Sequence, residues 1–284
     1  MQRVRGADRH IIALDLDGTV LDHDPESRAG LIAPDLAAAV QALHRAGHEV
    51  VISTGRSVDA TLPIVEELRI RPEWVICCNG AVTLQRDPLA ERSYRREYIE
   101  AFDPTEVLQR IRTHLVTAAF ALERPDGSFL YTEEIESGTL PARQKRVAFE
   151  DLLGVQTTRV VVVSPDHHLQ DFLDVVQSMG LDNVAYSVGF TSWLDIAPFG
   201  VNKASALEVV AARVDIDRSR VFAAGDGHND IDMLKWAAKH GDAVAMGQAD
   251  ATVQAVASRV TGTVSEGGLL SALVARFPEL EAIR

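Results

Sequence analysis

Strand-like apolar runs alternate with amphipathic stretches in the first part of the chain, and this alternation restricts the fold more than any other feature. Three apolar runs read as buried strands, at residues 11–14, 48–54 and 74–80. The stretches between them have apolar residues at helical spacing, at residues 34–47 and 57–70. A strand–helix–strand–helix–strand order is typical of a parallel sheet with crossover helices.

The pattern changes in the middle of the chain. Residues 84–100 alternate polar and apolar side chains like a hairpin, and short strands mixed with two helices follow. The alternation of strand and helix returns at Gly200. We therefore expect an α/β core with a parallel sheet, formed by residues 1–85 and 198–284. We expect residues 86–197 to be an inserted α+β domain with an antiparallel sheet.

The net charge limits the classes of binding partner, and the cysteines limit the cellular compartment. Lys and Arg number 28 and Asp and Glu number 41, so the formal net charge is −13. This balance argues against a nucleic-acid or anionic-membrane partner and leaves a small anionic substrate open. Cys77 and Cys78 are neighbours and would form a strained bridge, so we expect buried free thiols in a cytoplasmic protein. The apolar runs are too short for a signal-peptide core or a membrane span.

Four polar clusters lie at the ends of predicted strands or at the start of a predicted helix. They are Asp15 with Asp17, residues 54–56 (TGR), Lys203, and residues 225–230 (GDGHND). In an open parallel sheet, ligands bind at the carboxyl ends of the strands. The clusters are far apart along the chain, but this rule predicts that they meet at one edge of the sheet.

The residue types in these clusters indicate phosphoryl transfer. The carboxylates of Asp15, Asp17 and Asp226 suit Mg²⁺, and a divalent cation would let them coexist with a phosphate. Thr54 offers a hydroxyl donor and Lys203 a positive charge for phosphate oxygens. One carboxylate can attack phosphorus to form an aspartyl-phosphate, and a second can protonate the leaving oxygen and then activate water.

Each cluster taken alone also has a structural interpretation. The aspartate-rich segments can be turns or a helix cap, and Lys203 can be solvated helix surface. We interpret Asp22, Asp24 and His228 as loop residues. The order of the clusters and their common place at strand ends favour one site over four unrelated features.

The whole set of motifs resembles the haloacid dehalogenase (HAD) superfamily, and within it the Cof-type phosphatases with a class IIB cap. The resemblance extends over essentially the whole chain. The motifs that carry it are DLDGTVL at 15–21, STGR at 53–56, CNGA at 78–81, GVNKASAL at 200–207, GDGHND at 225–230 and AVAMGQA at 243–249. It implies a Rossmann-like core and an insert that acts as a cap and sets substrate specificity.

The resemblance also implies a role for individual residues. Asp15 would be the nucleophile, and Asp17 would be the general acid and base. The metal ion would be Mg²⁺, held by Asp15, the backbone carbonyl of Asp17, Asp226 and, from nearby, Asp230. The transferring phosphoryl group and the substrate would be bound by Thr54, Gly55, Arg56, Asn79, Gly80, Lys203 and Asn229.

The expected function is Mg²⁺-dependent hydrolysis of a small phosphorylated metabolite, and the resemblance favours a sugar phosphate. Three alternatives stay open: a phosphosugar mutase with the same core chemistry, a protein that binds a phosphometabolite without turnover, and an acidic scaffold. Specificity is expected to depend on the insert. The candidates there for a side chain that faces the substrate are Arg86, Arg92, Arg143, Lys145 and Trp193.

Overall fold

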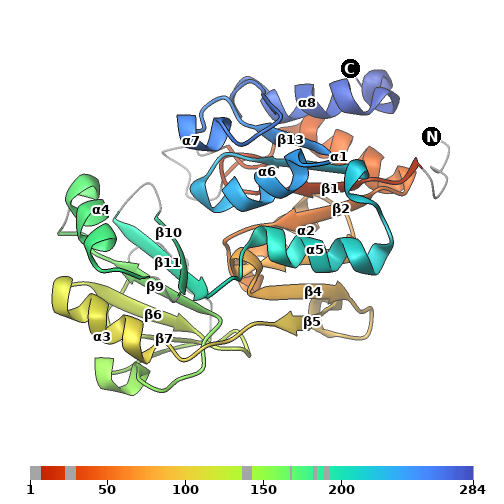
Figure 1. The fold of residues 1–284 in the computed structure, drawn as a ribbon. Coiled ribbons are helices and arrows are strands. Elements are labelled where there is room, and N and C mark those ends of the chain that lie inside the picture. The colour runs from red at the N-terminus through yellow and green to blue at the C-terminus, as the bar shows by residue number, and fades with distance from the viewer. Residues whose placement is uncertain are drawn as a thin grey trace.

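Two β-sheets organise the molecule, a larger one with eight strands and a smaller one with six (Figure 1). The computed structural model describes residues 8–22, 30–135, 143–166, 168–181, 184–188 and 192–283. Asp24, interpreted above as a loop residue, lies outside these described residues. The α/β core with an additional α+β unit, expected from the sequence, is confirmed.

The larger sheet is parallel from β14 to β3 and antiparallel at its last two strands, in the order β14-β13-β12-β1-β2-β3-β4-β5. Its strands are β1 (Ile11–Leu14), β2 (Glu49–Ser53), β3 (Trp74–Cys77), β4 (Val82–Arg86), β5 (Tyr94–Ile99), β12 (Val221–Gly225), β13 (Asp242–Ala245) and β14 (Arg259–Val260). The apolar runs predicted as buried strands are β1, β2 and β3, and every residue of these strands is buried.

Helices cover both faces of the larger sheet. One face packs against α1 (Pro34–Ala46), α2 (Val58–Glu67) and α8 (Gly268–Arg276), and the other against α5 (Lys203–Val214), α6 (Ile231–Ala238) and α7 (Ala251–Gln254). The two-residue period of a strand explains this arrangement. In β1, Ile12 and Leu14 belong to the first hydrophobic cluster, while Ile11 and Ala13 belong to the second.

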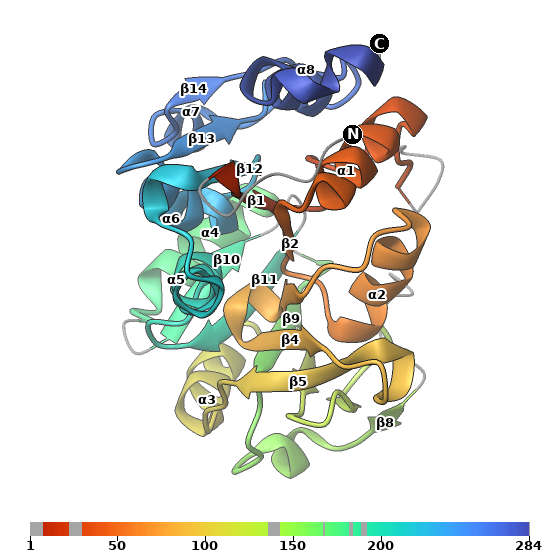
Figure 2. The same ribbon diagram turned by 90° about the vertical axis from the view of Figure 1, so that its right-hand side faces the viewer.

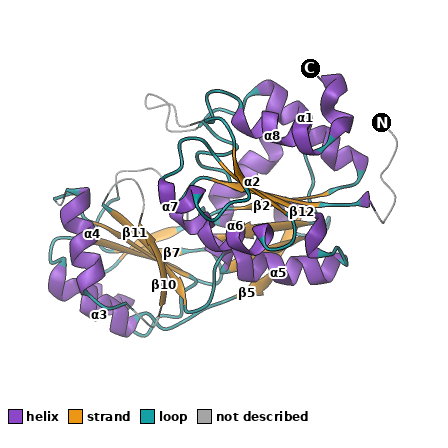
Figure 3. Ribbon diagram, turned by 45° about the horizontal axis from the view of Figure 1, so that its top comes forward, coloured by secondary structure: helices purple, strands orange, loops and turns teal. Residues whose placement is uncertain are grey.

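The smaller sheet is antiparallel except where β7 pairs with β8. Its order is β10 (Val184–Val188), β11 (Trp193–Pro198), β9 (Arg159–Val163), β6 (Ala119–Glu123), β7 (Phe129–Tyr131) and β8 (Gln144–Arg146). Two helices, α3 (Thr105–His114) and α4 (Leu169–Ser178), cover its outer face (Figure 3). Its other face is turned toward the larger sheet (Figure 1).

The hairpin at residues 84–100 belongs to the larger sheet, which differs from the expected insert boundary at residue 86. Strand β5 pairs with β4, and β4 pairs with β3, so both strands extend the core (Figure 2). The physical reason is that backbone pairing, and not the alternating side-chain pattern, decides which sheet a half-polar strand joins. By strand pairing, the inserted unit follows β5 and ends with β11.

The remaining helical turns are short. They are η2 (Cys78–Gly80), η3 (Glu91–Ser93), η4 (Phe149–Leu152), η5 (Arg218–Arg220), η6 (His228–Asp230) and η7 (Pro278–Ile283). Cys77 and Cys78 are buried free thiols, as predicted. Among the described residues, no helix combines the length and the apolar character needed to cross a membrane.

Candidate active site

The carboxyl ends of β12, β1, β2 and β3 lie side by side, because these parallel strands are neighbours in the larger sheet. Backbone hydrogen bonds connect the loops that follow them. The N–H of Asp15 donates to the carbonyl of Ala224 at 3.1 Å, and the N–H of Asn79 donates to the carbonyl of Thr54 at 3.0 Å. The four polar clusters of the sequence therefore meet at one edge.

Three buried carboxylates form the centre of this edge. Asp15, Asp226 and Asp230 each place one carboxylate oxygen within 4.8 Å of the others. Oδ2 of Asp230 also accepts the backbone N–H groups of Asp226 and Gly227, at 3.1 and 3.0 Å. Two backbone donors fix the Asp230 carboxylate, so the loop after β12 sets the geometry of the cluster.

Lys203 is the positive group of the cluster. Its Nζ donates to Oδ1 of Asp15 at 2.6 Å and to Oδ1 of Asp230 at 2.7 Å, and the lysine is fully buried. Burial alone would lower the pKa of Lys203, but the two carboxylates reverse this effect and the pKa is raised. Lys203 is the first residue of α5, and the Asn202 side chain caps that helix. The capped helix start aims the ammonium group into the site.

The donor set fits a divalent cation. Burial and the neighbouring Asp230 carboxylate raise the pKa of Asp15 well above its ordinary value, although Lys203 opposes them. Three carboxylates and one ammonium group leave excess negative charge in a buried place. Hard oxygen donors are the ligands that Mg²⁺ prefers, and such an ion would offset that excess.

Gln248 is a site residue that the sequence reasoning missed. Its Nε2 donates to the carbonyl of Gly18 at 2.5 Å and to Oδ2 of Asp226 at 3.1 Å. Its Oε1 accepts the backbone N–H of Val264 at 3.2 Å. The available signal was its position in the AVAMGQA motif, directly beyond β13. Gln248 thus connects the loop after β1 with Asp226 of the carboxylate cluster.

The side chain of Asp17 lies apart from the three-carboxylate cluster. Arg56 holds it through two hydrogen bonds, from Nε at 2.8 Å and from Nη2 at 2.5 Å. The hydrogen bond to Asp17 raises the pKa of Arg56. Asp17 is 34% exposed in its side chain, so it is the accessible carboxylate of the pair at positions 15 and 17. The structure therefore gives Arg56 a clear contact: it orients Asp17.

The remaining predicted residues line the same edge. The buried Thr54 hydroxyl accepts the backbone N–H of Arg56 at 3.1 Å. Asn229 donates through Nδ2 to Oδ1 of Asn79 at 3.0 Å, and a side chain at Gly55 would press on this pair. Gly80 has φ +103°, and a Cβ there would lie 2.3 Å from the Asn202 carbonyl, so the close approach of the turn to α5 requires glycine.

His228 does not join the cluster. It pairs with Asp250, the N-cap residue of α7, and both side chains are about half exposed. This agrees with its interpretation as a loop residue.

Comparison with known proteins identifies the family. A sequence model of haloacid dehalogenase-like hydrolases matches residues 12–273. The chain belongs to this family. It is 31% identical over 271 residues to the pyridoxal phosphate phosphatase YbhA of Escherichia coli, covering 89% of this chain and 93% of that protein. It is 28% identical over 281 residues to the 5-amino-6-(5-phospho-D-ribitylamino)uracil phosphatase YitU of Bacillus subtilis, covering 94% and 96%.

Solved structures agree with the family assignment. The chain superposes on the HAD phosphatase BT1666 of Bacteroides thetaiotaomicron with a TM-score of 0.71 and 25% identity, covering 95% of each chain. It superposes on the subclass IIB sugar phosphatase BT4131 with a TM-score of 0.75 and 20% identity, covering 95% and 99%, which shows a shared fold. The protein is a Cof-type HAD phosphatase, as the motifs predicted.

In this HAD phosphatase, a buried hydrogen bond joins the insert to the core. The Cys78 thiol donates to Oε2 of Glu123 at 3.2 Å, and Glu123 is fully buried at the end of β6. Burial raises the pKa of Glu123. Its Oε1 has no hydrogen-bond partner within the described part of the chain. The sequence predicted Cys78 as a buried free thiol and did not predict this contact, because nothing local indicates a partner in the insert.

Of the five insert candidates, Trp193 lies on the face turned toward the core. It packs against Ala121 and Val161, and Ala121 shares that face with Glu123 because the two are two residues apart. The other four lie elsewhere. Arg86 and Arg92 lie beside α2 in the core, Arg143 donates to the carbonyl of Asp126, and Lys145 is exposed on β8.

Proposed function

We propose that this phosphatase hydrolyses a small phosphorylated metabolite in a Mg²⁺-dependent reaction that passes through an aspartyl-phosphate on Asp15. The observation that supports this best is the setting of Asp15. Its carboxylate contacts the buried Lys203 ammonium group and lies within 4.8 Å of Asp226 and Asp230. A carboxylate held among fixed charged groups can accept a phosphoryl group without a large rearrangement of the groups around it.

Two carboxylates divide the chemistry in this proposal. A carboxylate oxygen of Asp15 attacks phosphorus, and the bond between phosphorus and the leaving oxygen breaks. Asp17 gives its proton to that oxygen. In the second half, Asp17 takes a proton from water, the water oxygen attacks phosphorus, and the bond to Asp15 breaks to release inorganic phosphate. Arg56 orients the Asp17 carboxylate by donating to both of its oxygens.

The other residues bind and orient. Mg²⁺ would be held by Asp15, the backbone carbonyl of Asp17, Asp226 and Asp230, and it would supply positive charge that polarises the phosphoryl oxygens. The Thr54 hydroxyl and the Lys203 ammonium group would bind phosphoryl oxygens. The remaining contacts to the phosphoryl group or the substrate would come from Gly55, Asn79, Gly80 and Asn229.

A sugar phosphate remains the proposed substrate class. The face of the insert turned toward the core offers both kinds of hydrogen-bonding group that hydroxyls need. Arg159 donates to Asp195 at 2.7 Å, and both side chains keep some exposure, at 12% and 16%. Trp193 on the same face provides an aromatic surface for a sugar ring or a heterocycle. YbhA and YitU are named for phosphorylated heterocyclic substrates, so such compounds belong in the same assay.

The test is phosphate release from a panel of sugar phosphates, pyridoxal phosphate and ribityl phosphates, with Mg²⁺ and with chelator. We expect wild-type release only with Mg²⁺, and we expect Asp15→Asn to lower it by about 10³-fold or more while the protein stays folded. The exposed Asp35→Asn is the matched control, since it removes the same charge outside the carboxylate cluster.

Near-normal turnover in Asp15→Asn would refute the aspartyl-phosphate step. Turnover that needs a bisphosphate activator would instead identify a mutase, and binding without release would identify a binding protein. The cytoplasmic location stays a prediction, based on the two buried free thiols.

A further inference from the structure

A pocket lies at the edge of the larger sheet that is opposite to the active site. Its volume is about 460 Å³, and it lies between the end of α2 and the β4–β5 hairpin, which are neighbours in Figure 2. Helix α2 begins directly after residues 54–56 of the active site and ends at this pocket. Ten residues of helix extend about 15 Å, so the two sites are separate.

The charge of the pocket is opposite to that of the protein. Four arginines and one glutamate line it, and they are Arg69, Arg71, Arg86, Arg92 and Glu66. The ionisable lining thus has an excess of positive charge in a chain whose formal net charge is −13. The rest of the lining is mostly apolar, and it is formed by Leu62, Val65, Ile70, Pro88, Ser93 and Tyr94.

Within the described residues, most of these arginines have no side-chain hydrogen-bond or ion-pair partner. Arg92 makes wide ion pairs with Asp59, at 3.6 Å, and with Glu66, at 4.0 Å. In the described part of the chain, no side-chain hydrogen bond or ion pair involves Arg69, Arg71 or Arg86. Four guanidinium groups beside one lining carboxylate repel one another, and a bound anion would relieve that repulsion.

The backbone of the lining is also unusual. Arg69, Arg92 and Ser93 have φ values of +52°, +55° and +62°, in the left-handed region that such residues rarely adopt. Each position of this kind costs about 1 kcal/mol or more. The left-handed residues lie on both walls of the pocket, one after α2 and two in the hairpin.

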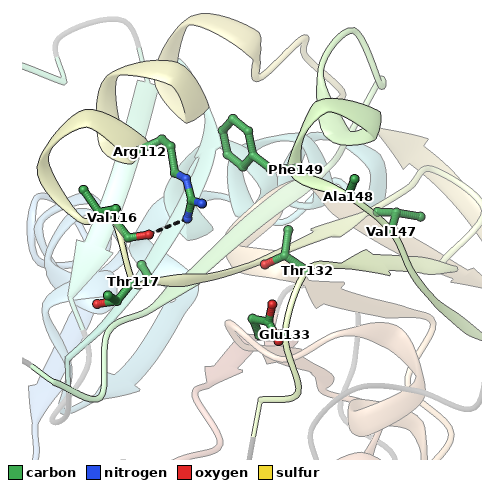
Figure 4. Close-up of a pocket in the computed structure, with 9 residues that line it drawn as sticks. Arg112, Val116, Thr117, Thr132, Glu133, Val147, Ala148 and Phe149 are labelled. Atoms are coloured by element: carbon green, nitrogen blue, oxygen red, sulfur yellow. Dashed lines mark hydrogen bonds between the residues drawn. The ribbon is translucent and has the colours of Figure 1, made fainter.

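A pocket on the insert provides a comparison, because the arginine that lines it is held by contacts with the protein. This pocket has a volume of about 350 Å³, and Arg112 is the arginine that lines it (Figure 4). Arg112 donates to the carbonyl of Val116 at 2.6 Å and lies over the rings of Phe120 and Phe149. Its guanidinium group is occupied by these contacts, whereas the described residues include no hydrogen-bond, ion-pair or ring partner for the side chains of Arg69, Arg71 and Arg86.

We propose that the arginine pocket binds a small molecule with two adjacent phosphate groups. Guanidinium groups on two facing walls match a diphosphate, because each can donate two parallel hydrogen bonds to phosphate oxygens. The apolar residues and Tyr94 form a surface for the remainder of such a molecule. Free diphosphate and a nucleoside diphosphate share this chemistry. The site does not depend on the proposed catalytic function.

Binding of pyrophosphate and of ADP to the wild-type protein, measured by calorimetry in chelator, tests the proposal. We expect one molecule per chain, and we expect Arg86→Gln to weaken binding about tenfold. The double variant Arg69→Gln/Arg71→Gln should weaken it further. The matched control is Lys235→Gln/Lys239→Gln, which removes two exposed positive charges on and just after α6 and should leave binding unchanged.

Binding of either ligand supports the proposed site if the arginine variants weaken that binding. Tighter binding of ADP would show that the apolar wall contacts a nucleoside, and equal binding would identify diphosphate as the recognised part. Absence of binding, or binding that the arginine variants leave unchanged, would overturn the proposal. In that case the arginines only complement the carboxyl end of α2. Phosphate release by Arg86→Gln, which should equal that of the wild type, keeps this result distinct from failure of the catalytic proposal.

Discussion

The two edges of the larger sheet carry clusters of opposite charge, and these clusters differ in how their charges are stabilised. At the carboxyl edge, buried carboxylates share a single ammonium group through short contacts, and these residues are Asp15, Asp226, Asp230 and Lys203. At the other edge, the arginines of the pocket are mostly exposed, and three of them have no side-chain hydrogen-bond or ion-pair partner among the described residues. Both arrangements leave an excess of one sign, so both suit a ligand of the other sign.

Burial explains the difference between the edges. A charge out of contact with water needs a partner, since an unpaired buried ion costs several kcal/mol. Exposed arginines can stay unpaired because water solvates them. The active-site edge therefore depends on its internal contacts for stability as well as for chemistry, whereas the arginine edge should tolerate substitution. The predictions below test that contrast.

The largest effect is expected from Lys203→Met. Removing the ammonium group leaves Asp15 and Asp230 facing each other without their shared partner. We expect the free energy of unfolding, measured with urea in chelator, to fall by about 3–5 kcal/mol. We expect phosphate release with Mg²⁺ to fall by about 100-fold or more.

Mg²⁺ should restore part of the lost stability in Lys203→Met, because a cation at the carboxylates replaces some of the missing charge. The exposed Lys235→Met is the control and should change neither stability nor activity by much. Equal stability of Lys203→Met and the wild type in chelator would contradict the contrast between the two edges.

The sequence predicted the core strands because their apolar runs are continuous, and it predicted the meeting of the polar clusters because parallel strands end at one edge. It misplaced the hairpin containing β5, whose alternating residues would suit either sheet. The sheet that accepts such a strand is decided by pairing with β4, and no local pattern encodes that choice.

The missed contacts of the site share one property: they join residues far apart in sequence. Gln248 reaches Gly18, and Cys78 reaches Glu123. Neither pair has a motif that links its members, and both depend on how loops from different strands pack. The pairing of Asp17 with Arg56 is similar, because both residues were identified while their contact was not.

A second prediction concerns Glu49, a buried carboxylate at the start of β2 and thus on the arginine edge. Burial raises its pKa to about 7, although Arg9 opposes the shift from 3.3 Å. Between the ordinary glutamate pKa of 4.5 and about 7, the folded protein keeps a proton that the unfolded chain releases. Stability therefore falls as pH rises through this window, by at most about 3 kcal/mol.

Glu49→Gln should remove this loss of stability at rising pH. Relative to the wild type, its free energy of unfolding should rise between pH 5 and pH 8 by roughly 2 kcal/mol and then level off. Urea unfolding at both pH values measures the change, with the exposed Glu106→Gln as the control for loss of one negative charge. A difference between Glu49→Gln and the wild type that is independent of pH would show that Glu49 is adequately solvated or paired.

The smallest effect, and the most local, is expected from a pair of glycine substitutions. Gly18 and Gly154 have nearly the same backbone, with φ of +74° and +75°. An added Cβ at Gly18 would lie 2.0 Å from Oδ2 of Asp226, whereas nothing lies within 4 Å of a Cβ at Gly154. Both alanine variants should lose about 1 kcal/mol of stability from backbone strain. Gly18→Ala must in addition displace Asp226.

A Mg²⁺ titration of phosphate release separates these two costs. We expect Gly18→Ala to need about tenfold more Mg²⁺ or to lose about tenfold in rate, since a ligand displaced by even a fraction of an ångström weakens the site. Gly154→Ala should titrate like the wild type while showing the same loss in urea. If both variants titrate alike, then Asp226 can move without consequence. The crowding of the carboxyl edge would then be a matter of packing and not of metal binding.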